Sequence, residues 1–157
     1  MFKLHQNVLI KANNEVVWSF MEDFSRSLSY NRFHRQIEST PGMAKRVNDI
    51  FYIQHRFLFR THPMKIAIND WNPNESFTLD EKTEKEKPGL NHRTTFSLYP
   101  EDNFTTLQYS LECNTENYLI DIFCKPIFKA AMIEELLKIK NAIESSVTTH
   151  SQSFEPI

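Results

Sequence analysis

The chain begins with alternating apolar and polar residues and changes to a helical period after residue 13. One side of an extended strand carries Phe2, Leu4, Val8 and Ile10. This period of two is typical of a half-buried strand. Asn13 or Asn14 can cap a following helix. That helix is indicated by the helical spacing of Val17, Phe20, Met21 and Phe24. A second short helix is predicted over residues 25–32.

The middle of the chain predicts strands separated by turn residues. Alternating apolar positions indicate strands at 36–40, 48–59, 64–71, 77–79, 92–98 and 107–113. Proline, glycine and asparagine at 41–42, 72–74 and 100–103 supply the turns. Short connections favour an antiparallel meander. The charged segment 80–87, including Glu81, is predicted to be a solvated hairpin.

From residue 118 the apolar residues recur at helical spacing to about residue 145. The apolar stripe consists of Leu119, Ile122, Phe123, Ile127, Ala130, Ile133, Leu137 and Ile143. Lysine and glutamate residues, including Glu135, fall largely outside it. We expect the stripe to lie on the sheet, so that the helix and the sheet bury their apolar faces against each other.

Pro126 lies inside this helical pattern, where a proline removes a backbone hydrogen bond and clashes with the preceding turn. The sequence therefore predicts a bend or break near residues 122–126. The alternative is a pair of helices, with Pro126 in the first turn of the second.

Length and composition indicate one folded domain, at 1–147, followed by a frayed tail at 148–157. The 157 residues are 40% apolar and 24% charged, with a formal net charge of −2. This balance disfavours nucleic-acid binding, which usually needs a basic surplus. The chain has only two glycines, Gly42 and Gly89. Their separation excludes phosphate-binding loops and nucleophile elbows that need clustered glycines.

Cysteine and histidine spacing predicts neither a metal site nor a cofactor. Cys113 and Cys124 do not form a CxxC pair, and no two histidines lie four residues apart on a predicted helix. The first residues lack the apolar core of a secretory signal, and no apolar stretch is long enough to span a membrane. A cytoplasmic location is the expectation.

The order of elements resembles the helix-grip fold of the START-like, or SRPBCC, superfamily. This is an α+β fold in which a curved antiparallel sheet of six to seven strands holds two short helices and one long C-terminal helix. VWSFMEDF at 17–24 and LLKIKNAIE at 136–144 are similar to segments of its polyketide cyclase/dehydratase and lipid-transport branch. VNDIF at 47–51 sits where relatives carry a Gly-Asp-Phe-like start of a hairpin, with Asn48 in place of the glycine. The usual Trp-Asn-Pro after the second helix is replaced by residues 30–34.

The resemblance implies a cavity between the sheet and the long helix, which relatives use for lipids, sterols, polyketides and other apolar molecules. Strand parity and the helix stripe suggest the ligand-binding residues Phe51, Ile53, His55, Phe57, Phe96, Leu107, Tyr109, Leu111, Phe123 and Ile127.

Two polar side chains stand out among these candidates. His55 lies between phenylalanines, where it could anchor a ligand, act as a general base, or be a core histidine bonded to a carbonyl. Tyr109 could bond a ligand or an internal partner. His92 shares a face with Thr94 and is a weaker candidate. Asp70 lies either at the pocket mouth or, as the better interpretation, in a turn next to Asn72.

Two functions follow from these observations. The first is a binding or carrier protein for a hydrophobic small molecule. The second is a cyclase- or dehydratase-like enzyme that uses a pocket acid or base, with His55 as the best candidate. We rank binding first because the sequence shows no carboxylate–histidine pair at a recognisable spacing. A protein-interaction module is a third possibility, and the chain is expected to be a monomer or weak homodimer.

Overall fold

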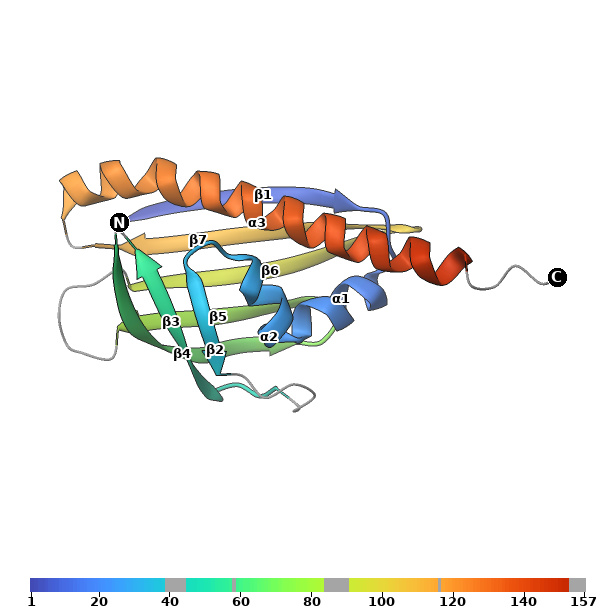
Figure 1. The fold of residues 1–157 in the computed structure, drawn as a ribbon, viewed down its shortest axis with the longest axis horizontal. Coiled ribbons are helices and arrows are strands. Elements are labelled where there is room, and N and C mark those ends of the chain that lie inside the picture. Colours follow the sequence, from blue (N-terminus) through green and yellow to red (C-terminus); the bar gives the residue numbers. More distant parts are fainter. Residues whose placement is uncertain (39–44, 58, 84–90, 116, 153–157) are drawn as a thin grey trace.

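The computed structural model describes residues 1–38, 45–57, 59–83, 91–115 and 117–152. Within these ranges seven strands form one antiparallel sheet, and its helices lie on one face (Figure 1). In chain order the elements are β1 (Phe2–Ile10), α1 (Asn14–Glu22), α2 (Phe24–Ser27), η1 (Leu28–Tyr30, a 3₁₀ turn), β2 (His34–Glu38), β3 (Ile50–Phe57), β4 (Arg60–Asn72), β5 (Ser76–Thr83), β6 (Asn91–Glu101), β7 (Phe104–Asn114) and α3 (Tyr118–Gln152).

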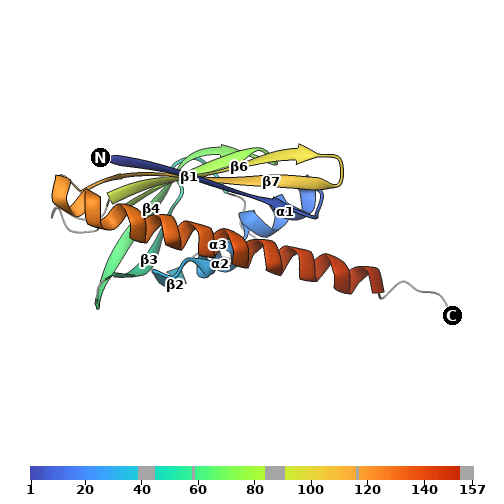
Figure 2. The same cartoon turned by 90° about the horizontal axis from the view of Figure 1, so that it is seen from above.

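The sheet has the order β1-β7-β6-β5-β4-β3-β2. Strands β2 to β7 therefore form a meander, and β1 closes the sheet beside β7. Figure 2 shows β2 and β3 turning toward the side on which α1, α2 and α3 lie. The predicted helix-grip architecture is confirmed, with seven strands in the described part of the chain.

Local signals in the sequence account for several boundaries. The Asn13 side chain accepts a hydrogen bond from the Val16 amide at 3.0 Å and caps α1. Asn48 has a φ of 74°, so the position where relatives carry glycine needs a left-handed backbone that asparagine tolerates. Segment 25–32 forms α2 and η1 rather than one helix, because the chain tightens to a 3₁₀ turn at Leu28.

Large aromatic side chains fill the core under α1 and α2. Trp18 and Trp71 lie with ring centroids 5.1 Å apart, and both contact Phe77. Asp70 lies outside this core and accepts a hydrogen bond from the Asn72 side chain at 2.8 Å. The expected contact with Asn72 is therefore confirmed, but Asp70 lies in β4, two residues before its end, rather than in the turn itself.

The buried face of α3 is not the one that the apolar stripe predicted. Of the eight stripe residues only Ile143 is buried, while Phe123 is 73% exposed and Ile127 is 36% exposed. The face against the sheet instead carries Cys124, Phe128, Ala131, Met132, Glu135, Leu136, Ile139 and Ile143. The prediction was wrong because the helix is apolar on two opposite sides, and spacing alone does not choose between them.

The helix α3 also differs from the prediction in length. It runs without interruption through Pro126 and continues to Gln152, past the expected end near residue 145 (Figures 1 and 2). The two-helix alternative at Pro126 was therefore wrong. A bend at this proline stays a prediction. No helix within the described ranges has the length and apolar character needed to cross a membrane.

The face of α3 that is buried against the sheet predicts unequal losses of stability when two neighbouring leucines are each changed to alanine. Leu136 is 2% exposed, so we expect Leu136→Ala to lower the free energy of unfolding by about 2–5 kcal/mol. Leu137 is 49% exposed, so Leu137→Ala should cost about 0.5 kcal/mol or less. Chemical denaturation at one low protein concentration measures both changes. Equal losses would contradict the buried face described above.

Candidate functional site

Four polar side chains meet on the inner face of the sheet, in the interior that α3 covers. They are His34 on β2, His55 on β3, Glu81 on β5 and His92 on β6, and each is 8% exposed or less. We call them the histidine–glutamate cluster. Burying the charged form of a histidine or glutamate is costly unless an opposite charge or a hydrogen bond compensates it. The neighbours of each cluster member therefore determine whether it is charged.

Strand register and sheet curvature bring the cluster together. Glu81 lies directly opposite His92 on the neighbouring strand, and His34 lies opposite His55. Strands β2 and β5 are separated in the sheet by β3 and β4. The curling of β2 and β3 over the inner face therefore allows His34 to approach Glu81.

One carboxylate oxygen is the centre of the cluster. Glu81 Oε2 lies 3.1 Å from His92 Nε2 and 3.5 Å from His34 Nε2. The other oxygen, Oε1, accepts a long hydrogen bond of 3.4 Å from the Thr94 hydroxyl. His34 Nδ1 lies 2.9 Å from the Leu28 carbonyl oxygen. Since a carbonyl only accepts, Nδ1 carries a proton and Nε2 is the atom turned toward Glu81.

The contact between His34 and Glu81 is incompletely satisfied. Neither His34 Nε2 nor Glu81 Oε2 makes a hydrogen bond of good geometry within the described part of the chain. Buried polar atoms are nearly always hydrogen-bonded, so this pair has capacity for one more polar group.

Electrostatics divides the cluster into charged and neutral members. Burial, followed by the neighbouring His92 and His34, lowers the pKa of His55 to about 3. Burial alone would raise the pKa of Glu81, but His92 and His34 outweigh it and hold that pKa well below its usual range. At neutral pH His55 is therefore uncharged and Glu81 is ionised.

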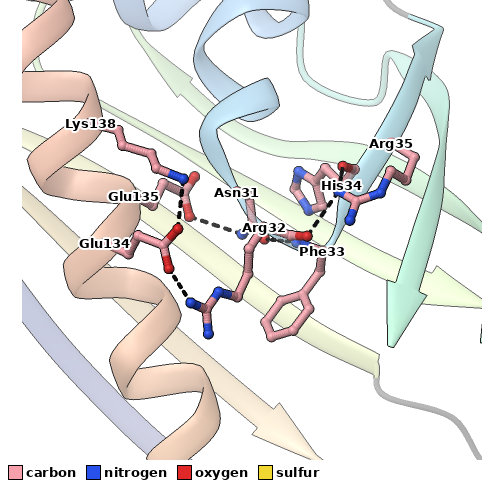
Figure 3. Close-up of polar contacts among 8 residues, drawn as sticks. All are labelled: Asn31, Arg32, Phe33, His34, Arg35, Glu134, Glu135 and Lys138. Atoms are coloured by element: carbon pink, nitrogen blue, oxygen red, sulfur yellow. Dashed lines mark hydrogen bonds and ion pairs between the residues drawn. The ribbon is translucent and has the colours of Figure 1, made fainter. Parts of the chain in front are cut away.

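A second buried polar group faces the cluster from α3. The Asn31 side chain donates to Glu135 Oε2 at 2.9 Å (Figure 3). Burial, reinforced by the charge of Glu81, raises the pKa of Glu135 well above its usual range. Burial also raises the pKa of Tyr109, whose hydroxyl lies within reach of Thr94 and Asn31. Glu135 and Tyr109 are thus protonated beside an ionised Glu81.

Three phenylalanine rings cover the histidines. Phe33, Phe57 and Phe128 contact one another with centroids 5.5–6.1 Å apart. The Phe33 ring lies 5.5 Å from His55, and the Phe128 ring lies 5.9 Å from His92. The cluster is therefore polar at its centre and aromatic at its boundary.

A depression of about 220 Å³ lies at the end of β5, β6 and β7, and Glu81, His92 and Cys113 are among the residues that line it. Exposed residues, including Arg93 and Asn114, complete its wall. It does not include the predicted ligand-binding residues.

The structure places those predicted residues in three environments. Phe51, Ile53, His55, Phe96, Leu107, Tyr109 and Leu111 are buried on the inner face of the sheet. Phe57 is half-buried. Phe123 and Ile127 lie on the outer face of α3, away from the sheet, so the expectation that they close the interior was wrong.

Sequence reasoning missed the carboxylate of the site. Glu81 had the parity of the buried residues Phe77 and Leu79, but the charge run that follows it suggested solvent exposure. In the structure Glu81 is 2% exposed and pairs with His92. The supposed absence of a carboxylate–histidine pair was therefore wrong. The available signal was that Glu81 falls on the same side of its strand as the buried Phe77 and Leu79. No neighbouring residues in the sequence indicated that His34, Asn31 or Glu135 would be buried.

Neither cysteine nor metal chemistry is favoured by the geometry. Burial raises the pKa of the Cys113 thiol to about 12, so the thiol stays protonated and unreactive. Among the described residues, no group of three or more histidine, cysteine or acidic side chains is arranged to hold a metal ion.

Comparison with solved structures identifies the fold. A conserved protein from Geobacillus kaustophilus has a TM-score of 0.72 at 18% identity, covering 92% of this chain and 97% of its own. The Zhui aromatase/cyclase from Streptomyces sp. R1128 has a TM-score of 0.70 at 8% identity, covering 93% and 95%. The Aha1 dimer from Colwellia psychrerythraea has a TM-score of 0.64 at 18% identity, covering 92% and 97%. No protein family model and no curated protein matches the sequence.

These likenesses show that the chain has the START-like helix-grip fold. One of these structures is an aromatase/cyclase, but a shared fold does not establish a shared function, so function has to be argued from the site itself.

The electrostatics of His55 predicts a pH dependence of stability. Its folded pKa of about 3 lies below the ordinary value of 6.5, so the unfolded chain binds one more proton in that window. The free energy of unfolding should therefore rise with pH by up to roughly 1.4 kcal/mol per pH unit from this group, and level off above 6.5. His55→Gln should remove this part of the slope, as measured by denaturation at several pH values.

The matched control is His5→Gln, because His5 is an exposed histidine on β1 and, unlike His62, is not among the groups that lower the pKa of His55. This variant should keep the wild-type slope. A slope unchanged by His55→Gln would contradict the neutral, buried state of His55.

Proposed function

We propose that the protein binds a small, largely apolar molecule between the sheet and α3, and that the histidine–glutamate cluster holds its polar group. The apolar body would contact the inner-face residues that the sequence suggested, led by Phe51, Phe57 and Leu111. Phe123 and Ile127 are not part of this proposal.

The observation that carries the proposal is the incompletely satisfied pair of Glu81 Oε2 and His34 Nε2, 3.5 Å apart inside an apolar interior. Ligand pockets typically combine apolar walls with a few convergent polar groups. A buried pair with spare hydrogen-bonding capacity supplies such a group. The aromatic boundary formed by Phe33, Phe57 and Phe128 supplies a matching apolar wall.

The chemistry of the pair specifies the polar group of the ligand. Ionised Glu81 accepts hydrogen bonds, and His34 Nε2 accepts one whenever the ring is neutral. The ligand should therefore present a donor, such as an alcohol, a phenol or an amine. A carboxylate would repel Glu81 at close range. Lipid-like alcohols and phenolic, polyketide-like molecules both meet this description.

A series of eight-carbon probes tests this selectivity. We expect 1-octanol and octylamine to bind at pH 7, and octanoate to bind at least tenfold more weakly, since removing a charge-assisted contact costs about 1.5–3 kcal/mol. Glu81→Gln should weaken octylamine most and reduce the discrimination against octanoate. Isothermal titration calorimetry measures the affinities.

The control is Glu101→Gln, an exposed carboxylate on β6 outside the cluster. It should leave all three affinities unchanged. Binding of octanoate as tight as that of octylamine, or the absence of binding by every probe at millimolar concentration, would contradict the proposal.

A second function, a dehydratase- or cyclase-like enzyme, is favoured by the divided ionisation of the two buried carboxyl groups. An ionised Glu81 can remove a proton from carbon, and a protonated Glu135 can donate one to a leaving hydroxyl. Environments that push two pKa values apart are typical of acid–base pairs.

Loss of water from a β-hydroxy ketone tests this alternative. Glu81 would take the α-proton, the C–H electrons would form the double bond, and the hydroxyl would leave as water with the proton from Glu135. We expect Glu81→Gln and Glu135→Gln each to lower the rate about 10²–10⁴-fold, as measured by the absorbance of the enone. Wild-type rates equal to those in buffer would leave only the binding function.

A further inference from the structure

The outer face of α3 carries an apolar stripe that nothing in the described part of the chain covers. The stripe consists of Leu119, Phe123, Pro126, Ala130, Ile133 and Leu137, all exposed, and it is flanked by the exposed Ile122 and Ile127. Phe123 is 73% exposed and Leu119 is 66% exposed. In Figure 2 α3 crosses the foreground, with β1, β6 and β7 above it in the view and β2 and β3 below it. Monomeric soluble proteins rarely expose so large a continuous apolar patch.

The spacing of this outer stripe is that of a helix-to-helix contact. Its positions alternate in steps of four and three residues from 119 to 137, which is the heptad repeat of a two-stranded coiled coil. At 1.5 Å per residue the stripe is about 27 Å long. It ends at Lys140, the next heptad position, whose Nζ donates to the Leu9 carbonyl within the same chain.

The charges beside the stripe fit a parallel partner with the same sequence. In a parallel coiled coil, a residue in position g of one helix lies beside the residue in position e five places later on the other. In this register those residues are Lys129 and Glu134. Lys129 makes no ion pair within the described ranges, and Glu134 is held at the flank of the stripe by Arg32 and Lys138 (Figure 3).

The extent of the exposed surface also suits a second copy of the chain. The outer stripe and its two flanking isoleucines place eight exposed apolar side chains along one face of α3, a continuous surface that the matching helix of a second chain can bury. The charged side chains beside the stripe are mainly lysines, Lys125, Lys129 and Lys138, with Glu134 as the accessible carboxylate among them, so an anionic membrane surface is the competing occupant that the test has to exclude.

We infer that the protein forms a parallel homodimer through the outer stripe of α3, with Lys129 of each chain beside Glu134 of the other. The opposite face of α3 stays packed on the sheet. This inference does not rest on the proposed ligand, since the contact and the histidine–glutamate cluster lie on opposite faces of α3.

Light scattering coupled to size-exclusion chromatography tests the inference. We expect the wild-type mass at about 100 µM to be twice the 18.6 kDa of one chain. Ile133→Glu places a charge in the middle of the stripe and should give a monomer that remains folded. Leu9→Glu, which alters an exposed apolar residue on β1, is the matched control and should remain dimeric.

A charge exchange tests the register. Lys129→Glu should weaken dimerisation about tenfold, because it places two glutamates side by side at both symmetric contacts. The double variant Lys129→Glu/Glu134→Lys restores opposite charges at both contacts and should dimerise more tightly than Lys129→Glu, although it loses the bridges from Glu134 to Arg32 and Lys138. Leu137→Cys should form an intermolecular disulfide on oxidation, because only a parallel arrangement brings the two copies of residue 137 together.

Several results would overturn the inference. One is a monomeric wild type at about 100 µM, and another is a dimer that Ile133→Glu leaves intact. Wild-type monomers that bind vesicles of anionic phospholipid and lose this binding in Ile133→Glu would assign the stripe to a membrane surface instead. A double charge variant that dimerises no more tightly than Lys129→Glu would contradict the parallel register.

Discussion

The interaction on which the rest of the structure depends is the burial of an ionised carboxylate, Glu81, between His92 and His34. A lone carboxylate in this interior would have to take up a proton, because desolvation of the charge is too costly. Pairing with His92 requires only the register of β5 and β6, but pairing with His34 requires the sheet to curl until β2 faces β5. The curvature of the sheet and the charge of Glu81 therefore depend on each other.

Burial and the charge on Glu81 together set the state of the other buried carboxyl group. Burial is the main reason that the pKa of Glu135 is raised, and the nearby charge of Glu81 raises it further, so the group stays protonated. Its hydrogen bond with Asn31 ties α3 to the segment between η1 and β2. Of the two apolar sides of α3, the side with Glu135 faces the sheet, where Asn31 can satisfy the polar group. The polar interior thus helps fix the rotation of the helix.

The sequence predicted the fold well because its strand signals are local. Alternation in β1, β3, β6 and β7 and the turns between strands are readable from neighbouring residues, and the order of elements read in this way led to the resemblance. The site was harder because its members come from positions far apart in the chain. Glu81 had the correct parity but was misjudged from its charged neighbours, and His34 reaches the cluster only through sheet curvature. The phase of α3 could not be read because both sides of the helix are apolar.

Two adjacent residues of α3, Glu134 and Glu135, connect its outer stripe and its buried face to the same segment of the chain. Glu135 is buried and contacts Asn31, while the neighbouring, partly exposed Glu134 contacts Arg32, so two neighbouring bridges join α3 to the same short segment (Figure 3). A ligand that moves Asn31 would also move Arg32, because the two residues share a peptide unit. The bridge from Arg32 holds Glu134, which the inferred dimer places beside Lys129 of the second chain. A displacement of residues 31–32 would therefore reach both the buried carboxyl group of Glu135 and the carboxylate of Glu134 at the flank of the outer stripe.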